Sequence, residues 1–231
     1  MAIFVNYLRE DTPLEEVLGR LFADLQIGFE NQQAIESFLA PLRDKGPIYK
    51  FHYNHTLRVA ILCMKVAEFM HLDKKALLYA GLLHDVGKAL VSARTLGKTS
   101  GWTEKDTREM RPHVMDGYKL IRGRFDFTAE IILWHHRFQA KGYPVAIPHA
   151  LHPYCLGSKT MIQVYGRILS LCDQFDAFHR VNDKQGATVI PTGEEILLLM
   201  YKANPDQRVL LDELYKADIF TTFTTSEEPR D

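Results

Sequence analysis

The stretch His84-Asp85-Val86-Gly87-Lys88 places an imidazole, a carboxylate and an ammonium at the end of an apolar run, Ala76 to Leu83. A buried carboxylate is costly without a partner, so Asp85 should pair with a cation or shift its pKa. Lys88, one helical turn later, could form a structural ion pair with it. A divalent metal ion could instead bind the imidazole and the carboxylate together. The stretch alone leaves both interpretations open.

Further histidines and aspartates recur in apolar segments along the chain. Each is a weak signal by itself, because a lone histidine is more often a satisfied core residue. Imidazole and carboxylate together are typical donors for first-row divalent ions. Seven donors exceed the ligands of one tetrahedral ion, which indicates two metals that share a carboxylate. These five histidines and two aspartates fall on five separate expected helices: His55, His84, Asp85, His113, His135, His136 and Asp173.

The elements that must position these residues are predicted to be helices, because period-two strand patterns are scarce. We therefore expect an all-α fold, a bundle of roughly seven to ten helices. Capping signals mark several starts, at Thr12, Asp73, Thr103, Thr128 and Thr192. Six of the predicted helices cover residues 12–28, 31–43, 48–70, 161–180, 192–203 and 205–217. Three more are expected to begin at Asp73 and include His84-Asp85, to run from Thr103 through Tyr118 and beyond with a kink at Pro112, and to begin at Thr128 and include His135-His136. Residues 137–160 are expected to form a loop.

Two of these helices carry more specific expectations. Adjacent helical side chains diverge by roughly 100 degrees. His135 and His136 would therefore approach a metal by different nitrogens, or serve it together with a solvent-exposed face. In the helix over 48–70, His55 is expected on the side away from a polar stripe formed by Asn54, Arg58, Lys65 and Glu68.

The overall composition bounds the class of protein. A length of 231 residues suits one domain or one domain with an appendage, and the net charge is −1. A net charge this small would not attract the whole protein to a nucleic-acid duplex or to an anionic membrane. Three scattered cysteines argue against a disulfide framework and favour a reducing compartment. The N-terminal residues lack the apolar core of a signal peptide, and no apolar run could cross a bilayer. We expect a cytoplasmic protein with a helical extension over 1–45, a main domain over 46–217 and a C-terminal tail over 218–231, frayed over 221–231.

The order of motifs resembles the HD superfamily of metal-dependent phosphohydrolases, and most closely its HD-GYP branch. The likeness covers about residues 50–180 and includes both naming motifs, at His84-Asp85 and at Gly142-Tyr143-Pro144. It implies a helical bundle of the HD-domain type. The other matching residues are His55, Arg58-Val59-Ala60, Thr103-Glu104, Met110, His113, Gly117, His135-His136, Arg167-Ile168, Asp173 and Asp176-Ala177.

The resemblance also implies which residues would hold two divalent transition-metal ions. Asp85 would bridge the ions, and Lys88 would contact a substrate phosphate. Iron or manganese is favoured, with nickel, zinc or magnesium as alternatives. The ligands implied for one ion are His55, His84, Asp85 and Asp173, and those for the other are Asp85, His113, His135 and His136.

The chain departs from the family pattern at several positions. Phe51 stands where members with three metals carry a glutamate, so we expect two metals and no ligand role for His52. Arg137 replaces the glutamate after the double histidine, and residues 139–141 replace an Asp-Gly pair. The segment 180–184 stands where the family has a basic Arg-Pro-Tyr-Arg segment that helps to hold cyclic di-GMP. These departures bear on the substrate more than on the metals.

The activity implied is hydrolysis of a cyclic dinucleotide, with cyclic di-GMP as the first candidate, by a hydroxide generated between the two metals. An alternative is an HD-type hydrolase of nucleotides or phosphomonoesters. Another is a non-catalytic metal-bound module that docks a signalling protein through the Gly-Tyr-Pro loop. The expected partner is a small nucleotide phosphoester, and a homodimer stays open. Weaker candidates are pocket cations at Arg137, Lys141, Lys159 and Arg180, Tyr143 in the pocket wall, and a zinc site at His149 and His152, which are more often exposed loop residues.

Overall fold

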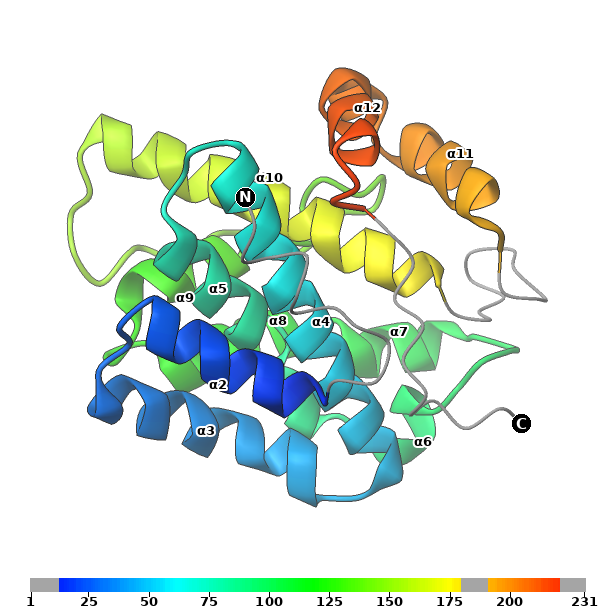
Figure 1. Ribbon diagram of the computed structural model, residues 1–231. Helices are drawn as coiled ribbons and strands as arrows, with labels where there is room; N and C mark the ends of the chain where they lie inside the picture. The colour runs from blue at the N-terminus through cyan, green and yellow to red at the C-terminus, as the bar shows by residue number, and fades with distance from the viewer. Residues whose placement is uncertain (1–12, 180–190, 221–231) are drawn as a thin grey trace.

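Helices and short 3₁₀ turns form all the secondary structure in the part of the chain that the computed structural model describes, residues 13–179 and 191–220 (Figure 1). The predicted all-α fold is thereby confirmed. The elements in chain order are α2 (Leu14–Asp24), α3 (Phe29–Asp44), α4 (Pro47–Phe69), α5 (Lys74–Leu83), η1 (Val86–Leu90), α6 (Ala93–Leu96), α7 (Glu104–Met110), α8 (His113–Ile121), α9 (Asp126–Ile132), α10 (Leu156–Phe178), α11 (Gly193–Ala203), η3 (Pro205–Gln207) and α12 (Arg208–Lys216).

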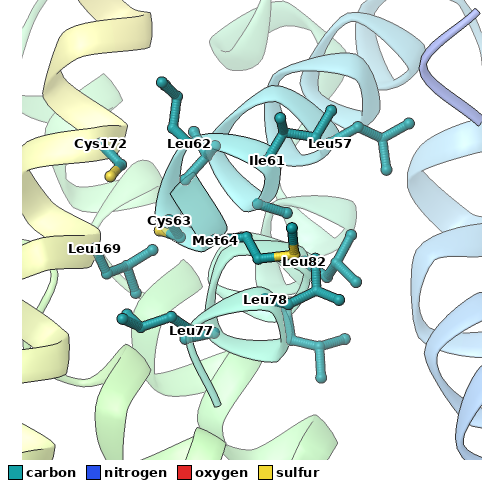
Figure 2. Close-up of a cluster of buried hydrophobic side chains, with 14 of the residues drawn as sticks. Leu57, Ile61, Leu62, Cys63, Met64, Leu77, Leu78, Leu82, Leu169 and Cys172 are labelled. Atoms are coloured by element: carbon teal, nitrogen blue, oxygen red, sulfur yellow. The ribbon is translucent and has the colours of Figure 1, made fainter. Parts of the chain in front are cut away.

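The long helix α4 lies in the middle of the bundle and is buried on most of its faces (Figure 1). Helix α5 packs closely on it, because a Cβ added to Gly81 would lie 2.4 Å from the Cα of Ala60. This close contact fixes the position of His84, the residue that follows α5. The apolar contact surface between the two helices is visible in Figure 2 and includes Leu57, Ile61, Met64, Leu78 and Leu82.

Helix α10 packs along the same core from another side. Leu169 and Cys172 of α10 lie near Cys63 of α4 (Figure 2). All three cysteines of the chain are free, as the absence of a disulfide pattern predicted. The helices α11 and α12 lie beside the C-terminal half of α10 (Figure 1). A buried hydrogen bond joins them to it, because the Arg167 guanidinium donates to Oδ1 of Asn204 at 2.9 Å.

Helices α2 and α3 lie side by side along one flank of the bundle (Figure 1). Their apolar faces, with Leu21 and Ile35 at their centres, are buried in the same hydrophobic core as α4. The division into 1–45, 46–217 and 218–231 stays a prediction. None of the described helices is long and apolar enough to span a membrane.

Several predicted caps are confirmed. Asp73 accepts from the backbone N–H of Ala76, and Thr103 and Thr192 each form a capping box with an acidic residue three positions later. The prediction that Thr128 caps a helix is wrong, since α9 already begins at Asp126 and Thr128 lies inside it. Thr12 lies outside the described residues.

Other predicted boundaries need correction. The first helix ends at Asp24 rather than near Gly28, because Gln26 takes a left-handed conformation with φ 51°. Pro112 separates two helices, α7 and α8, instead of kinking one. Helix α10 begins at Leu156, five residues earlier than predicted, because Gly157 is accommodated in its first turn. The expected frayed end over 221–231 lies outside the described residues.

Candidate metal centre

The centre forms where α5 ends inside the core. His84 follows the last residue of α5, and Asp85 occupies the turn that begins η1. Both side chains are fully buried. The η1 turn lies directly against α8, because a Cβ on Gly87 would come within 1.9 Å of the carbonyl oxygen of His113. Only glycine permits this close approach of the two backbones. The approach brings Asp85 next to His113, the first residue of α8.

Asp85 is the shared member of the cluster. Its Oδ2 lies 3.4 Å from Nε2 of His55 and 3.3 Å from Nε2 of His84. Its Oδ1 lies 3.3 Å from Nε2 of His113 and 4.0 Å from Nε2 of His135. Each carboxylate oxygen therefore faces a different pair of imidazoles, which is the arrangement that a carboxylate shared between two cations requires.

Two groups of donors are close enough to surround one ion each. Within each group the donor atoms all lie within 4.8 Å of one another. Asp173 of α10 approaches both groups, since its Oδ1 is 3.1 Å from Nε2 of His55 and its Oδ2 is 3.9 Å from Nδ1 of His136. All seven candidate residues thus meet at one place. The groups are His55, His84 and Asp85, and His113, His135 and His136.

Three of the imidazoles are oriented by the backbone. Nδ1 of His84, His113 and His135 lies 2.8, 2.7 and 2.6 Å from the carbonyl oxygen of the residue three positions earlier. Since a carbonyl only accepts, Nδ1 carries the proton and Nε2 keeps its lone pair. Within the described chain these three Nε2 atoms are buried and make no hydrogen bond. Buried lone pairs aimed at a common point, with each ring held by a second hydrogen bond, fit divalent metal ions.

His55 is oriented by a carboxylate instead. Its Nδ1 lies 2.6 Å from Oδ2 of Asp176, and Arg58 donates to both oxygens of Asp176 at 2.6 and 3.2 Å. The prediction that Arg58 belongs to a polar stripe opposite His55 is therefore wrong. Residues three apart on a helix share a face, and here that face is buried against α10.

The structural role of Asp176 was not assigned from the sequence, although the residue belonged to a matched motif. A usable signal was its spacing from Asp173, because carboxylates three residues apart project from the same face of a helix. Asp173 faces the centre itself, whereas Asp176 holds the back of the His55 ring.

The double histidine lies beyond the end of α9, which stops at Ile132. The expectation of divergent helical side chains is therefore wrong, and the ring centroids of His135 and His136 are only 4.0 Å apart. Tyr143 covers the outer face of His136, with the rings stacked at 4.6 Å and 28°. The Gly-Tyr-Pro loop thus closes the centre on the side of the second donor group.

The electrostatics suit cation binding. Burial, assisted by His84, lowers the pKa of His135 to about 3, and burial lowers that of His136 well below its usual range. Burial opposes the ionisation of Asp85, yet His84 and Lys88 outweigh it and hold the pKa of that carboxyl well below its usual range. Burial also opposes the ionisation of Asp173, but His55 and His136 outweigh it and lower the pKa of that carboxyl. At neutral pH these imidazoles are neutral and both carboxylates are charged.

The remaining sequence candidates divide into three groups. Lys88 belongs to the centre, where its ammonium pairs with Oδ2 of Asp85 and its side chain keeps 11 % exposure. Arg137 supports the loop, because it donates to the carbonyls of Pro144 and Val145 at 2.7 and 3.0 Å. Lys159, His149 and His152 line a different cavity. Arg180 lies outside the described residues.

The rim of the centre holds a cation that the sequence did not single out. The Arg111 guanidinium lies 5.3 Å from the centroid of the Tyr143 ring and contacts the carbonyl of Lys141 at 3.4 Å. Its place between α7 and α8 gave no such signal, because side chains two residues apart in a helical turn point in different directions.

Comparison with known proteins adds a family and several relatives. Residues 52–177 match the HD domain model, a range that contains all seven candidate ligands. The chain is 25 % identical over 173 residues to the 3'3'-cGAMP-specific phosphodiesterase 1 of Vibrio cholerae, covering 72 % of this chain and 37 % of that protein. It is 29 % identical over 133 residues to a cyclic di-GMP phosphodiesterase of Thermotoga maritima, covering 54 % and 33 %. A cyclic di-GMP phosphodiesterase of Pseudomonas aeruginosa is 26 % identical over 135 residues, covering 55 % and 30 %. The chain spans about a third of the length of these relatives.

Proposed function

Because the chain belongs to the HD-domain family, we propose that it is a metal-dependent phosphodiesterase that hydrolyses a cyclic dinucleotide, with cyclic di-GMP as the first candidate. The observation that carries the proposal is the position of Asp85, whose two oxygens face separate groups of imidazoles. Phosphodiester hydrolysis is the chemistry that such a pair of sites serves. The printed names of the three relatives support the substrate class.

The proposed centre holds two divalent ions, with iron or manganese favoured and nickel, zinc or magnesium as alternatives. When bound, such ions polarise phosphoryl oxygens and lower the pKa of water. Asp85 would contribute one oxygen to each ion. The proposed ligands of one ion are His55, His84, Asp85 and Asp173, and those of the other are Asp85, His113, His135 and His136.

Lys88 is proposed to stabilise the charge that gathers on the phosphate during hydrolysis. Its ammonium pairs with Oδ2 of Asp85, and its side chain keeps 11 % exposure. From this position at the edge of the donor groups, the ammonium would donate to a phosphate oxygen. A positioned donor of this kind contributes to transition-state stabilisation without needing a covalent intermediate.

A charged side chain at the rim of the metal centre partly supports a nucleotide substrate. The Arg111 guanidinium above Tyr143 would place a positive charge beside a substrate phosphate. Arg137 is engaged with loop carbonyls and is not proposed as a phosphate ligand.

A second enzymatic candidate, an HD-type hydrolase of nucleotides or phosphomonoesters, is favoured by one observation. The basic segment that helps the HD-GYP branch to hold cyclic di-GMP is replaced by 180–184.

The test begins with metal content. Protein purified without chelator should contain two equivalents of divalent metal by elemental analysis and should hydrolyse cyclic di-GMP or 3'3'-cGAMP with manganese or ferrous iron. The panel should also include a nucleoside monophosphate and p-nitrophenyl phosphate. Turnover of these monoesters alone would favour the second candidate. Tight binding of a cyclic dinucleotide without product would favour a non-catalytic module.

The decisive variant is Asp85→Asn, which keeps the side-chain size and removes the shared charge. It should lose both metals and all hydrolysis while retaining its helical circular-dichroism spectrum. The matched control is Asp116→Asn, because Asp116 is a partly exposed carboxylate on α8 that pairs with Lys119 at 3.8 Å. Full activity of Asp85→Asn after metal removal would contradict the proposal.

A further inference from the structure

A cavity separate from the metal centre lies between α9, the first turns of α10 and the segment 147–154. Its volume is about 400 Å³. Its wall combines apolar and aromatic side chains, including Trp134, Tyr154 and Ile162, with the carboxyl group of Glu130. A cavity of this size suits a small organic molecule.

Glu130 is the unusual member of this wall. It is only 7 % exposed, and its one described hydrogen bond is a long one, from the hydroxyl of Tyr118 to Oε1 at 3.5 Å. Among the described residues no lysine, arginine or histidine forms an ion pair with it. Burial raises its pKa, which neither the Tyr118 hydroxyl nor Arg122 offsets. A buried carboxylate in this condition gains most from a ligand that brings its own positive charge and N–H donors.

The other polar groups of the cavity do not supply that charge. His152 is already engaged, since its Nε2 lies 3.1 Å from Oδ2 of Asp126. Lys159 and Gln163 are exposed at the rim, where a charge is screened by solvent. Burial, Glu130 and Asp126 together raise the pKa of Tyr154, so the inner wall is electronegative.

The cavity is not a metal site of the kind found at the centre. The described groups of three close donors belong to the metal centre, and Glu130, His149 and His152 form no such group. An anion is disfavoured by the buried carboxyl group. The apolar wall instead favours a carbon chain beside the charged end of the ligand.

We propose that this cavity binds a small primary alkylammonium, with its N–H groups donating to Glu130 and its carbon chain lying against Trp134, Tyr154 and Ile162. An ammonium has three donors and one positive charge, which match the unpaired carboxylate. This binding site is independent of the proposed hydrolysis, and neither fails with the other.

The test uses Trp134 as the reporter. The chain has two tryptophans, so Trp102→Phe leaves Trp134 as the single indole. This 231-residue variant is titrated with butylammonium chloride, and the indole fluorescence and the indole N–H resonance are followed. We expect a saturable change that neither the neutral counterpart butan-1-ol nor sodium chloride at equal concentration reproduces.

Substitution at the carboxyl group makes the test specific. Glu130→Gln should weaken butylammonium binding roughly tenfold or more, because a charge-assisted contact becomes a neutral one. The control Glu213→Gln, at an exposed position of α12, should bind as the parent does. Since Glu130→Gln could impair folding, Ala150→Phe serves as a second variant. Ala150 also lines the cavity, and a phenyl ring there would occupy the space of the carbon chain, so the binding should weaken.

Three results would overturn the proposal. They are the absence of saturation with butylammonium, an equal response to butan-1-ol, and undiminished binding by folded Glu130→Gln. Unchanged binding by Ala150→Phe would likewise count against it.

Discussion

Asp176→Asn is the perturbation that best tests how the first donor group is held together. In the native chain one carboxylate, 3 % exposed, accepts from His55 and from two nitrogens of Arg58 at 2.6 to 3.2 Å. An asparagine keeps the volume but has one acceptor oxygen and no charge. It cannot serve both partners. His55 loses the group that fixes its proton on Nδ1, and Arg58 keeps its charge in a buried place.

Two magnitudes follow from this geometry. Loss of a carboxylate that orients a metal-binding histidine typically lowers metal affinity by about 10–100-fold, or about 1.4–2.8 kcal/mol. Removing one partner of a buried ion pair also destabilises the metal-free fold, by about 3–5 kcal/mol. The two effects are separable because the first is measured on folded protein and the second by unfolding.

The assay is a competition titration against a chelator at neutral pH, on protein whose fold has been checked by circular dichroism. We expect one ion per chain to bind more weakly than in the parent protein. The ion at the second donor group, which Asp176 does not touch, should keep its parent affinity. Denaturant unfolding in excess chelator gives the separate loss of stability.

The control is Asp206→Asn. Asp206 also pairs with an arginine of α10, at 2.6 Å from Arg167, but its side chain is 59 % exposed and remote from the donor groups. It should change neither quantity by much, because exposed pairs contribute little. Unchanged affinity for both ions in folded Asp176→Asn would refute the reasoning.

Further predictions concern the backbone, the charge states and the ammonium of the centre. Gly87→Ala should destabilise the protein by about 3 kcal/mol or more, because its Cβ would meet the His113 carbonyl oxygen at 1.9 Å. Gly19→Ala lies inside α2 with open space around it, and it should stabilise the protein by about 0.5–1 kcal/mol. Denaturant unfolding measures both, and equal effects would contradict the packing argument. The pKa of His135 falls from 6.5 to about 3 on folding, so the unfolded chain binds the extra proton between these values. Stability of the metal-free protein should therefore fall as pH drops below about 6.5, by up to about 1.4 kcal/mol per pH unit from this residue. Melting temperatures in chelator between pH 7 and 4 check this, with a flatter curve expected for His135→Gln. Lys88→Ala should keep both metals and lose about a hundredfold or more in turnover; unchanged turnover at full metal content would remove Lys88 from the mechanism.

The fold class and the identity of the clustered residues were predictable because they depend on local signals. Helical periodicity and the caps at Asp73, Thr103 and Thr192 are read from short segments. The seven candidate ligands were found because imidazoles and carboxylates in apolar segments need an explanation. Their assignment to two particular ions stays a prediction.

The failures share a physical cause, which is that a tertiary contact decided the local geometry. Arg58 was placed on a polar stripe because charge usually marks solvent, but Asp176 on a helix more than 100 residues later neutralises it. The double histidine was placed on a helix because apolar residues precede it. Helix α9 ends three residues before His135, and the chain then turns both rings toward one point.

The cavity beside Glu130 could not be predicted from the sequence either. One of its walls is the segment 147–154, whose prolines indicated only a loop. Whether such a loop packs against helices or extends into solvent depends on contacts that no local pattern records.

The separation of the donors along the chain has a thermodynamic consequence. His55 and Asp173 are contributed by helices α4 and α10, and their nitrogen and oxygen come within 3.1 Å only when those helices are packed together. An unfolded chain offers no such pocket, so cations bind the native state almost exclusively. At a free metal concentration of 100 times the dissociation constant, this linkage adds about 2.7 kcal/mol to the stability of the chain. A bound metal would therefore shift the balance between the folded and the unfolded chain, quite apart from any reaction the protein performs.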